Sequence, residues 1–209
     1  IVDWLCHAND TAAVLAETYD LGRSVALALE FYRRYPAETL IVVTADHETG
    51  GLAVGRGETA PMSFDALARQ TASVIGVTMR LRALRDARPG ETVPWDDVRG
   101  VLRESYGFWD YTELTPEEET LLKESYEESF RSQEGPLVRS LYYAVEPVAD
   151  CAVGIVARRT GMAWGSGAHT AAVVPVYVLG AGAERFAALR DNTDIPRAIA
   201  RAAGYPGAD

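Results

Sequence analysis

The sequence has 209 residues, of which 48% are hydrophobic, and its net charge is −10 at pH 7. The length suits one sizeable domain, or a core domain with an insertion. The acidic balance argues against nucleic acid as a partner, because a phosphate backbone is bound by basic surfaces, and no apolar run approaches the ~20 residues that a membrane span needs.

The first part of the chain combines one long helical pattern with one strand pattern. Apolar periodicity predicts helix across residues 9–36, with Asn9 or Asp10 as the N-cap. Gly22 predicts either two helices or a break within this stretch. The run at 39–45, TLIVVTA, is continuously apolar and β-branched. Such a run is typical of a parallel strand that is buried on both faces.

The middle of the chain reads as helical. Thr115, Pro116 and Glu118 predict the start of one helix, because they supply an N-cap, a proline at the first helical position and a capping-box acid. We interpret this part as a helical insertion or cap. Its predicted helices lie within residues 63–87, 94–107 and 115–133.

Strand patterns return near the C-terminus. Residues 151–158, CAVGIVAR, and residues 172–180, AVVPVYVLG, are predicted as strands. Pro175 makes the second of them an edge strand or a bulged one. Residues 194–204 are predicted to form a short closing helix.

These patterns divide the chain into three parts. Residues 1–56 and 149–209 are expected to be α/β core segments, and residues 57–148 a mainly helical insertion between them. The order helix, strand, helical insertion, strand, strand, helix is typical of an α/β fold.

The chain has two cysteines, Cys6 and Cys151. A disulfide between them is one possibility, but sequence cannot show that they are close together. Neither lies in a C-x-x-C motif, so we favour two partly buried thiols.

The three histidines are the candidate metal ligands. Asp3 and His7 are four residues apart, a spacing that puts both on one face of a helix, although a tight loop can also bring them together. Asp46 and His47 are adjacent and directly follow the predicted strand. Ligand sites of α/β proteins lie at the carboxyl ends of strands. His169 lies in a loop of small residues before a strand, a usual position for a ligand. Imidazole and carboxylate are common zinc ligands, although a histidine taken alone is more often a surface or core residue.

Adjacent residues on a regular strand point to opposite faces. Asp46 and His47 can therefore reach one ion only if the strand ends near Thr44 and the backbone turns. Gly50 and Gly51 permit such a turn.

Three segments carry a resemblance to a known family. DWLCHAND, LIVVTADHETGGL and SGAHTAAVVPVYVLGAGAERF resemble the C-terminal half of the bacterial alkaline phosphatases, in the family's order. The match is good over residues 1–56 and about 160–200. The resemblance implies part of a doubly wound sheet with a helical insertion. It also implies a phosphomonoesterase with two zinc ions and one magnesium ion, acting through a phosphoserine intermediate.

The resemblance assigns roles residue by residue. Asp3, His7 and His169 look like ligands of the first zinc, and Asp46 and His47 look like ligands of the second. The serine nucleophile, the phosphate-binding arginine and the aspartate shared by zinc and magnesium belong to the family's N-terminal half. The family's magnesium-binding glutamate lies a few residues before the equivalent of Asp3, so no catalytic residue and no magnesium ligand is nominated here. We expect that this chain is inactive alone, and that it is either a fragment of the complete enzyme or a partner of that missing half. The family also implies a periplasmic or extracellular location and a possible homodimer.

Two other functions stay open. One is a related hydrolase of the same superfamily, such as a phosphodiesterase, sulfatase or phosphonate hydrolase. The other is a metal-binding domain without catalysis.

Four neighbours of the candidate ligands have two interpretations each. Glu48 and Thr49 either orient ligands or are turn residues. Trp164 and Thr170 either shape the pocket or pack in the core. The triplet NDT at 9–11 fits a glycosylation sequon, but a helix cap is favoured.

Overall fold

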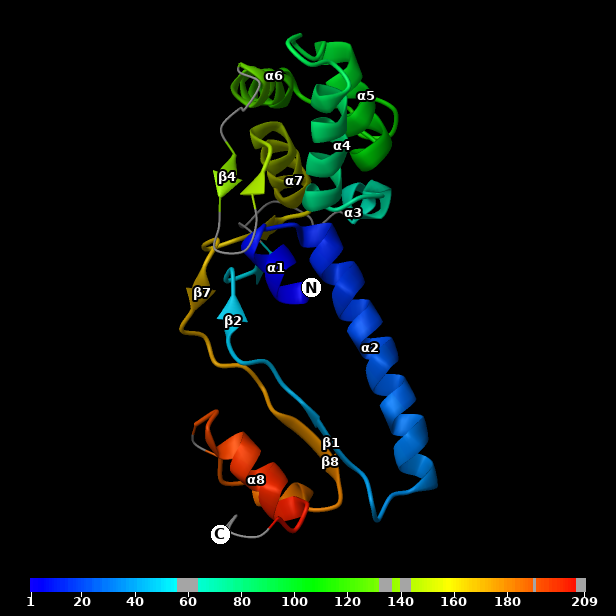
Figure 1. Cartoon of the computed structure of the whole chain (residues 1–209), viewed down its shortest axis with the longest axis vertical. Helices are drawn as coiled ribbons and strands as arrows, with labels where there is room; N and C mark the ends of the chain where they lie inside the picture. The colour runs from blue at the N-terminus through cyan, green and yellow to red at the C-terminus, as the bar shows by residue number, and fades with distance from the viewer. Residues whose placement is uncertain (56–63, 132–136, 140–143, 190, 206–209) are drawn as a thin grey trace. The chain divides into compact units, whose positions relative to one another are not determined.

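The computed structural model describes residues 1–55, 64–131, 137–139, 144–189 and 191–205. It divides into two compact units (Figure 1). The first unit contains residues 1–17 and 49–170, and the second contains residues 18–48 and 171–209. Among the described residues, no helix is both long and apolar enough to span a membrane. The three-part division proposed from the sequence stays a prediction.

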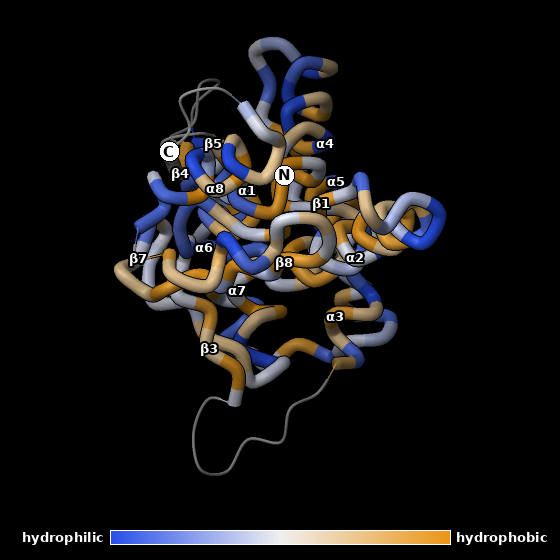
Figure 2. Tube along the Cα trace, turned by 90° about the horizontal axis from the view of Figure 1, so that it is seen from below, coloured by the Kyte–Doolittle hydropathy of each residue, from blue (hydrophilic) through white to orange (hydrophobic). Residues whose placement is uncertain are grey.

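The first unit is built around packed helices. Helix α6 packs against α7, and α4 contacts both α5 and α7. Hydrophobic and hydrophilic residues alternate along α4 (Figure 2), so this helix can bury one face and expose the other. The helices of this unit, besides the start of α2, are α1 (Val2–His7), α3 (Asp65–Arg69), α4 (Val74–Asp86), α5 (Trp95–Tyr106), α6 (Pro116–Phe130) and α7 (Pro147–Arg159).

Short two-stranded ladders complete the first unit. Strand β3 (Ala53–Val54) pairs antiparallel with β6 (Met162–Ala163), and β4 (Val138–Arg139) pairs antiparallel with β5 (Ala144–Val145). Strand β2 (Glu48–Thr49) pairs with β7 (His169–Thr170).

The predicted helices of the middle segment are largely confirmed. Thr115 and Glu118 form a complete capping box at the start of α6, with Pro116 at the first turn. The predicted helix at 63–87 is two helices, because Ser73 caps a new start by accepting a hydrogen bond from the N–H of Gly76. The predicted ends at 63 and at 132–133 lie outside the described residues.

The strand predicted at 151–158 is wrong, because this segment belongs to helix α7. Val148, Ala152, Ile155 and Val156 are all essentially buried. A helix that is covered on most sides shows no polar face, so its apolar run looks like that of a buried strand.

The second unit contains most of α2 (Thr11–Arg34) and a two-stranded ladder. Helix α2 runs through Gly22 without a break, contrary to the prediction. One glycine costs a helix only about 1 kcal/mol, which the rest of a 24-residue helix can offset.

The strand predicted at 39–45 is present as β1 (Leu40–Val43). Its described partner is β8 (Tyr177–Gly180), and the two run antiparallel, with Leu40 opposite Gly180 and Val43 opposite Tyr177. All four residues of β1 are half-buried and not fully buried. The prediction of a parallel strand buried on both faces is therefore wrong for the described ladder. An apolar run indicates a strand but does not specify the direction or identity of its neighbour.

The end of the chain matches its predicted elements. Strand β8 begins two residues after Pro175, whose ring cannot donate to a ladder. A short 3-10 helix, η1 (Ala183–Phe186), and helix α8 (Asp194–Ala202) follow. Helix α8 confirms the predicted closing helix.

Asp10 joins the start of α2 to the start of α4. Its carboxylate is fully buried and accepts hydrogen bonds from the N–H groups of Ala13 and Val74 and from the side chain of Gln70. The bond to Ala13, three residues on, is the N-cap geometry. Of the two caps proposed from the sequence, Asp10 is the one used.

Asp10 also makes stability depend on pH. Burial raises the pKa of Asp10 above its ordinary value, although its three hydrogen bonds act in the opposite direction. A raised pKa in the folded state favours folding at low pH, and this contribution is lost as pH rises through the folded-state pKa. We expect the free energy of unfolding of the wild type to fall relative to that of Asp10→Asn as pH rises from about 4. Urea unfolding of both proteins across a pH series measures this, and a difference that stays constant with pH would contradict it.

Candidate metal centre

Asp3 and His7 lie on one face of helix α1. Their Oδ1 and Nε2 atoms are 3.6 Å apart, and this pair has the i, i+4 spacing expected from the sequence. The side chain of His7 is buried, whereas that of Asp3 is 40% exposed. Leu5, between them, is buried and anchors the helix. The pair is therefore held at the edge of the first unit, with the carboxylate reaching solvent.

A backbone carbonyl fixes the ring of His7. The Nδ1 atom of His7 lies 2.7 Å from the carbonyl oxygen of Gly167. A carbonyl oxygen only accepts, so Nδ1 must carry the proton. In the neutral ring the lone pair is then on Nε2, the atom that faces Asp3.

His169 completes the group from the far end of the first unit's sequence. It lies in β7, and its ring centroid is 5.0 Å from that of His7. A ring nitrogen of His169 and a carboxylate oxygen of Asp3 are within 4.8 Å of each other. The ring of His169 is exposed. The fold thus brings together all three residues that the family resemblance assigned to a first metal site.

Thr49 contacts the group directly. Its hydroxyl donates a 2.7 Å hydrogen bond to Oδ1 of Asp3. Of the two interpretations left open for Thr49, the structure favours the ligand-orienting one. Glu48 lies beside it in β2.

The turn that follows Thr49 packs on Trp164. Gly50 and Gly51 both have positive φ, at 88° and 60°. The Gly50 carbonyl accepts from the N–H of Gly165, while the Gly50 N–H donates to Ala168, so the turn is tied to the loop before His169. The indole N–H of Trp164 donates to the hydroxyl of Thr11. Trp164 therefore packs and supports this loop.

Asp46 and His47 lie in the second unit. Strand β1 ends at Val43, and the backbone bends at Asp46 and His47, as the sequence required if both were to face one ion. Their Oδ2 and Nε2 atoms are 3.4 Å apart. The hydroxyl of Thr44 donates to the carbonyl of Pro175 and holds the end of the strand. The two side chains form a local pair that reaches solvent.

Cys6 and Cys151 do not form a disulfide. Burial raises the pKa of the Cys151 thiol above its ordinary value. The interpretation as two partly buried thiols agrees with the structure.

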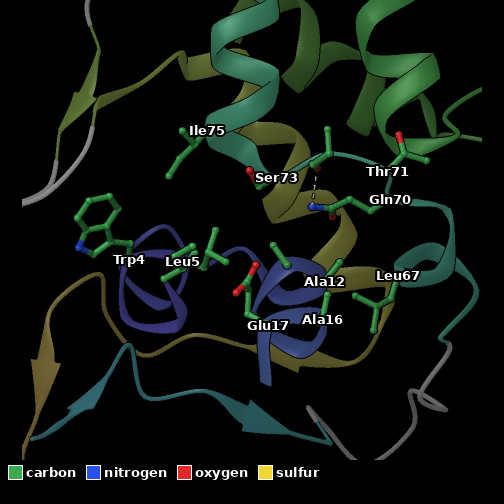
Figure 3. Close-up of a pocket in the computed structure, with 13 residues that line it drawn as sticks. Trp4, Leu5, Ala12, Ala16, Glu17, Leu67, Gln70, Thr71, Ser73 and Ile75 are labelled. Atoms are coloured by element: carbon green, nitrogen blue, oxygen red, sulfur yellow. Dashed lines mark hydrogen bonds between the residues drawn. The ribbon is translucent and has the colours of Figure 1, made fainter. Parts of the chain in front are cut away.

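A cavity of about 580 Å³ lies between α1, α2 and the segment that joins α3 to α4 (Figure 3). Its wall is mostly apolar, with Trp4 and Leu5 from α1 and Glu17 from α2. None of the candidate ligands lines it. We therefore assign the candidate centre to the side-chain group around Asp3 and not to this cavity.

Comparison with protein families gives one match across nearly the whole chain. The family model "Alkaline phosphatase" matches residues 1–205. This chain belongs to the alkaline phosphatase family. The resemblance noted from three sequence segments is confirmed.

Curated relatives of the family match at moderate identity. Alkaline phosphatase 3 of Bacillus subtilis is 28% identical over 204 residues, which is 98% of this chain and 38% of the relative. Alkaline phosphatase 4 of the same organism is 26% identical over 195 residues, or 92% of this chain and 35% of the relative. The repressible alkaline phosphatase of Saccharomyces cerevisiae is 39% identical over 59 residues, 28% of this chain.

Solved structures of alkaline phosphatases share the fold. The cold-active enzyme from a psychrophilic Shewanella sp. superposes with a TM-score of 0.70 at 23% identity, over 98% of this chain and 43% of that one. The Thermus thermophilus enzyme gives a TM-score of 0.68 at 26% identity, over 96% of this chain and 41% of that one. The chain therefore has the α/β fold predicted from its sequence, and it spans about two-fifths of the length of these relatives.

Proposed function

We propose that Asp3, His7 and His169 bind one zinc ion of a phosphatase that, as a complete protein, hydrolyses phosphate monoesters through a phosphoserine intermediate. The observation that carries the proposal is the convergence of these three side chains in a member of the alkaline phosphatase family. Two histidines and one carboxylate leave a fourth position open on a tetrahedral zinc, which is the arrangement of a catalytic site.

The spacing of the donor atoms supports a shared cation. Two ligands of a tetrahedral zinc, each bound at about 2.0–2.2 Å, lie roughly 3.4 Å apart. Asp3 Oδ1 and His7 Nε2 are 3.6 Å apart, which is too long for a good hydrogen bond. The Gly167 carbonyl selects the tautomer in which Nε2 presents its lone pair, a common arrangement for a metal-binding histidine.

The residues of the chain perform separate tasks in this proposal. When bound, the zinc supplies positive charge for the phosphoryl oxygens and lowers the pKa of a bound water or hydroxyl. Asp3 provides a carboxylate whose position is fixed by Thr49. The Gly167 carbonyl holds the Nδ1 proton of His7, so Nε2 is the ring nitrogen that would bind the metal. The exposed ring of His169 leaves the centre open to solvent and to a substrate.

We further propose that Asp46 and His47 contribute to a second zinc site. Their donor atoms, 3.4 Å apart, match the same ligand spacing. As the family resemblance implies, the serine nucleophile and the magnesium ligands would lie beyond these 209 residues. The chain alone is therefore proposed to bind metal without turning over substrate. Export from the cytoplasm and a homodimer remain expectations from the family.

Zinc binding by the isolated chain tests the proposal. After metal removal and equilibrium dialysis against zinc, we expect His169→Ala to retain at least one zinc fewer per chain than the wild type. The control is Asp20→Ala, which removes an exposed carboxylate on α2 and should leave the zinc content unchanged. Equal zinc content in the wild type and in His169→Ala would contradict the proposal.

The same samples separate binding from turnover. We expect the wild type and His169→Ala to hydrolyse an aryl phosphate at the same background rate. A rate in the wild type that His169→Ala abolishes would show that the chain holds its own nucleophile.

A further inference from the structure

Asn9 connects helices α1 and α2 in an unusual backbone conformation. Its φ is 51°, in the left-handed region. Asparagine is one of the few residues other than glycine that tolerate this region. The N–H of Asn9 donates to the carbonyl of Cys6 and closes the end of α1. The conformation turns the side chain back towards α1.

The carboxamide of Asn9 faces two carbonyl oxygens. One terminal atom of the carboxamide lies 2.9 Å from the oxygen of Cys6 and 2.9 Å from the oxygen of Ser166. Both neighbours only accept, so the NH₂ group faces them and donates one hydrogen to each. One side chain therefore links the helix that carries His7 to the loop that precedes His169.

The linked loop is the one that orients His7. Ser166 is followed by Gly167, whose carbonyl accepts from His7 Nδ1. The loop is further held by the Ser166 hydroxyl, which accepts from the N–H of Ala168. A Cβ atom at Gly167 would lie only 3.3 Å from the carbonyl oxygen of His7, so the loop and the end of α1 are in close contact. A shift of this loop would move the Gly167 carbonyl and His169 together.

We propose that Asn9 is a positioning residue for the metal centre, a clamp that sets the separation of His7 and His169. The inference rests on the proposed zinc site, because the clamp acts on two of its ligands. It also gives a structural role to Asn9, the first residue of the NDT triplet at 9–11, since both of its amide hydrogens are engaged within the fold.

Cobalt(II) titration of the chain tests the clamp, because tetrahedral cobalt(II) has visible absorption bands whose intensity reports its coordination. The variant is Asn9→Gly, which keeps the left-handed conformation and removes the carboxamide. We expect its cobalt(II) affinity to fall roughly 10- to 100-fold, the range seen when groups that orient metal ligands are removed. We also expect its bands to weaken as the ligand geometry loosens.

Val77→Ala is the matched control for stability. Val77 is fully buried in the helical core of the first unit, so its truncation destabilises the fold at a residue that belongs to neither the loop nor α1. We expect this variant to bind cobalt(II) with wild-type affinity and spectrum. A merely structural role for Asn9 would make the two variants behave alike.

A second variant covers the case in which Asn9→Gly does not fold. Asn9→Asp keeps the size of the side chain and tolerates the same φ, but its carboxylate repels the two carbonyls. The added negative charge alone would strengthen cobalt(II) binding, so weaker binding in Asn9→Asp supports the clamp. The proposed role of Asn9 is overturned if Asn9→Gly binds cobalt(II) with wild-type affinity and spectrum, or if Asn9→Asp binds it more tightly than the wild type. If the wild type itself binds no cobalt(II), the proposed zinc site fails, and the clamp with it.

Discussion

Replacement of Glu146 by alanine is expected to lower the free energy of unfolding of the first unit by about 3–5 kcal/mol. Glu146 has a fully buried side chain and forms a two-bond ion pair with Arg85, with N–O distances of 2.7 and 3.1 Å. The guanidinium also donates to the carbonyl of Ser129 and lies over the ring of Phe130. The side chain of Arg85 is only 12% exposed. Removal of the Glu146 carboxylate therefore leaves a positive charge that water solvates poorly.

The matched control is a similar pair at the surface. Arg88 and Asp97 form an ion pair of 2.6 Å, but their side chains are 33% and 36% exposed. We expect Asp97→Ala to cost less than about 1 kcal/mol, because water replaces the lost partner.

A double variant tests the cause of the loss. Arg85→Met combined with Glu146→Leu removes both charges and should recover most of the stability lost in Glu146→Ala. Chemical unfolding followed by circular dichroism measures all four proteins. Equal losses in Glu146→Ala and Asp97→Ala would show that burial of the pair has no energetic consequence.

Substitution of Gly50 by alanine is expected to cost about 2–6 kcal/mol and to weaken metal binding. At φ 88° a Cβ atom is strained, which costs about 1–3 kcal/mol. The same Cβ would lie 2.6 Å from two ring atoms of Trp164 and 3.0 Å from the carbonyl oxygen of Cys6. Relief of that overlap must move the ring or the end of α1, at a further cost of about 1–3 kcal/mol.

Gly55→Ala isolates the contribution of the contact. Gly55 has the same φ of 88°, but a Cβ atom there would meet no atom of the described residues within 4 Å. We expect this variant to lose only the strain energy and to keep its zinc affinity. The loss of zinc affinity in Gly50→Ala is expected because Gly50 is bonded to the loop before His169 and adjoins Thr49, which holds Asp3. Equal stability losses in the two variants would refute a role for the Trp164 contact.

Local sequence determined the features that depend on neighbours along the chain. The start of α6 follows from Thr115, Pro116 and Glu118, since a capping box needs only residues three apart. The end of β1 and the bend at Asp46 and His47 agree with the requirement that adjacent ligands face one side. The five candidate ligands and the family were also identified from short motifs.

Tertiary structure decided the features that depend on burial and on partners. Residues 151–158 form a helix although their apolar run suits a strand, because a helix covered on most sides needs no polar face. The neighbour of β1 is antiparallel β8, a pairing that the residues of β1 do not encode by themselves. Helix α2 is unbroken at Gly22, because the free-energy cost of one glycine is small compared with the stabilisation contributed by the rest of a long helix.

The proposed metal centre combines both kinds of information. Its candidate ligands are side chains whose chemistry is visible in the sequence, so Asp3, His7 and His169 could be proposed in advance. The groups that orient them are largely backbone carbonyls, at Gly167 for His7 and at Cys6 and Ser166 for Asn9. Every residue has a carbonyl, so no pattern of side chains marks these three, and only the folded chain determines which of them face the centre.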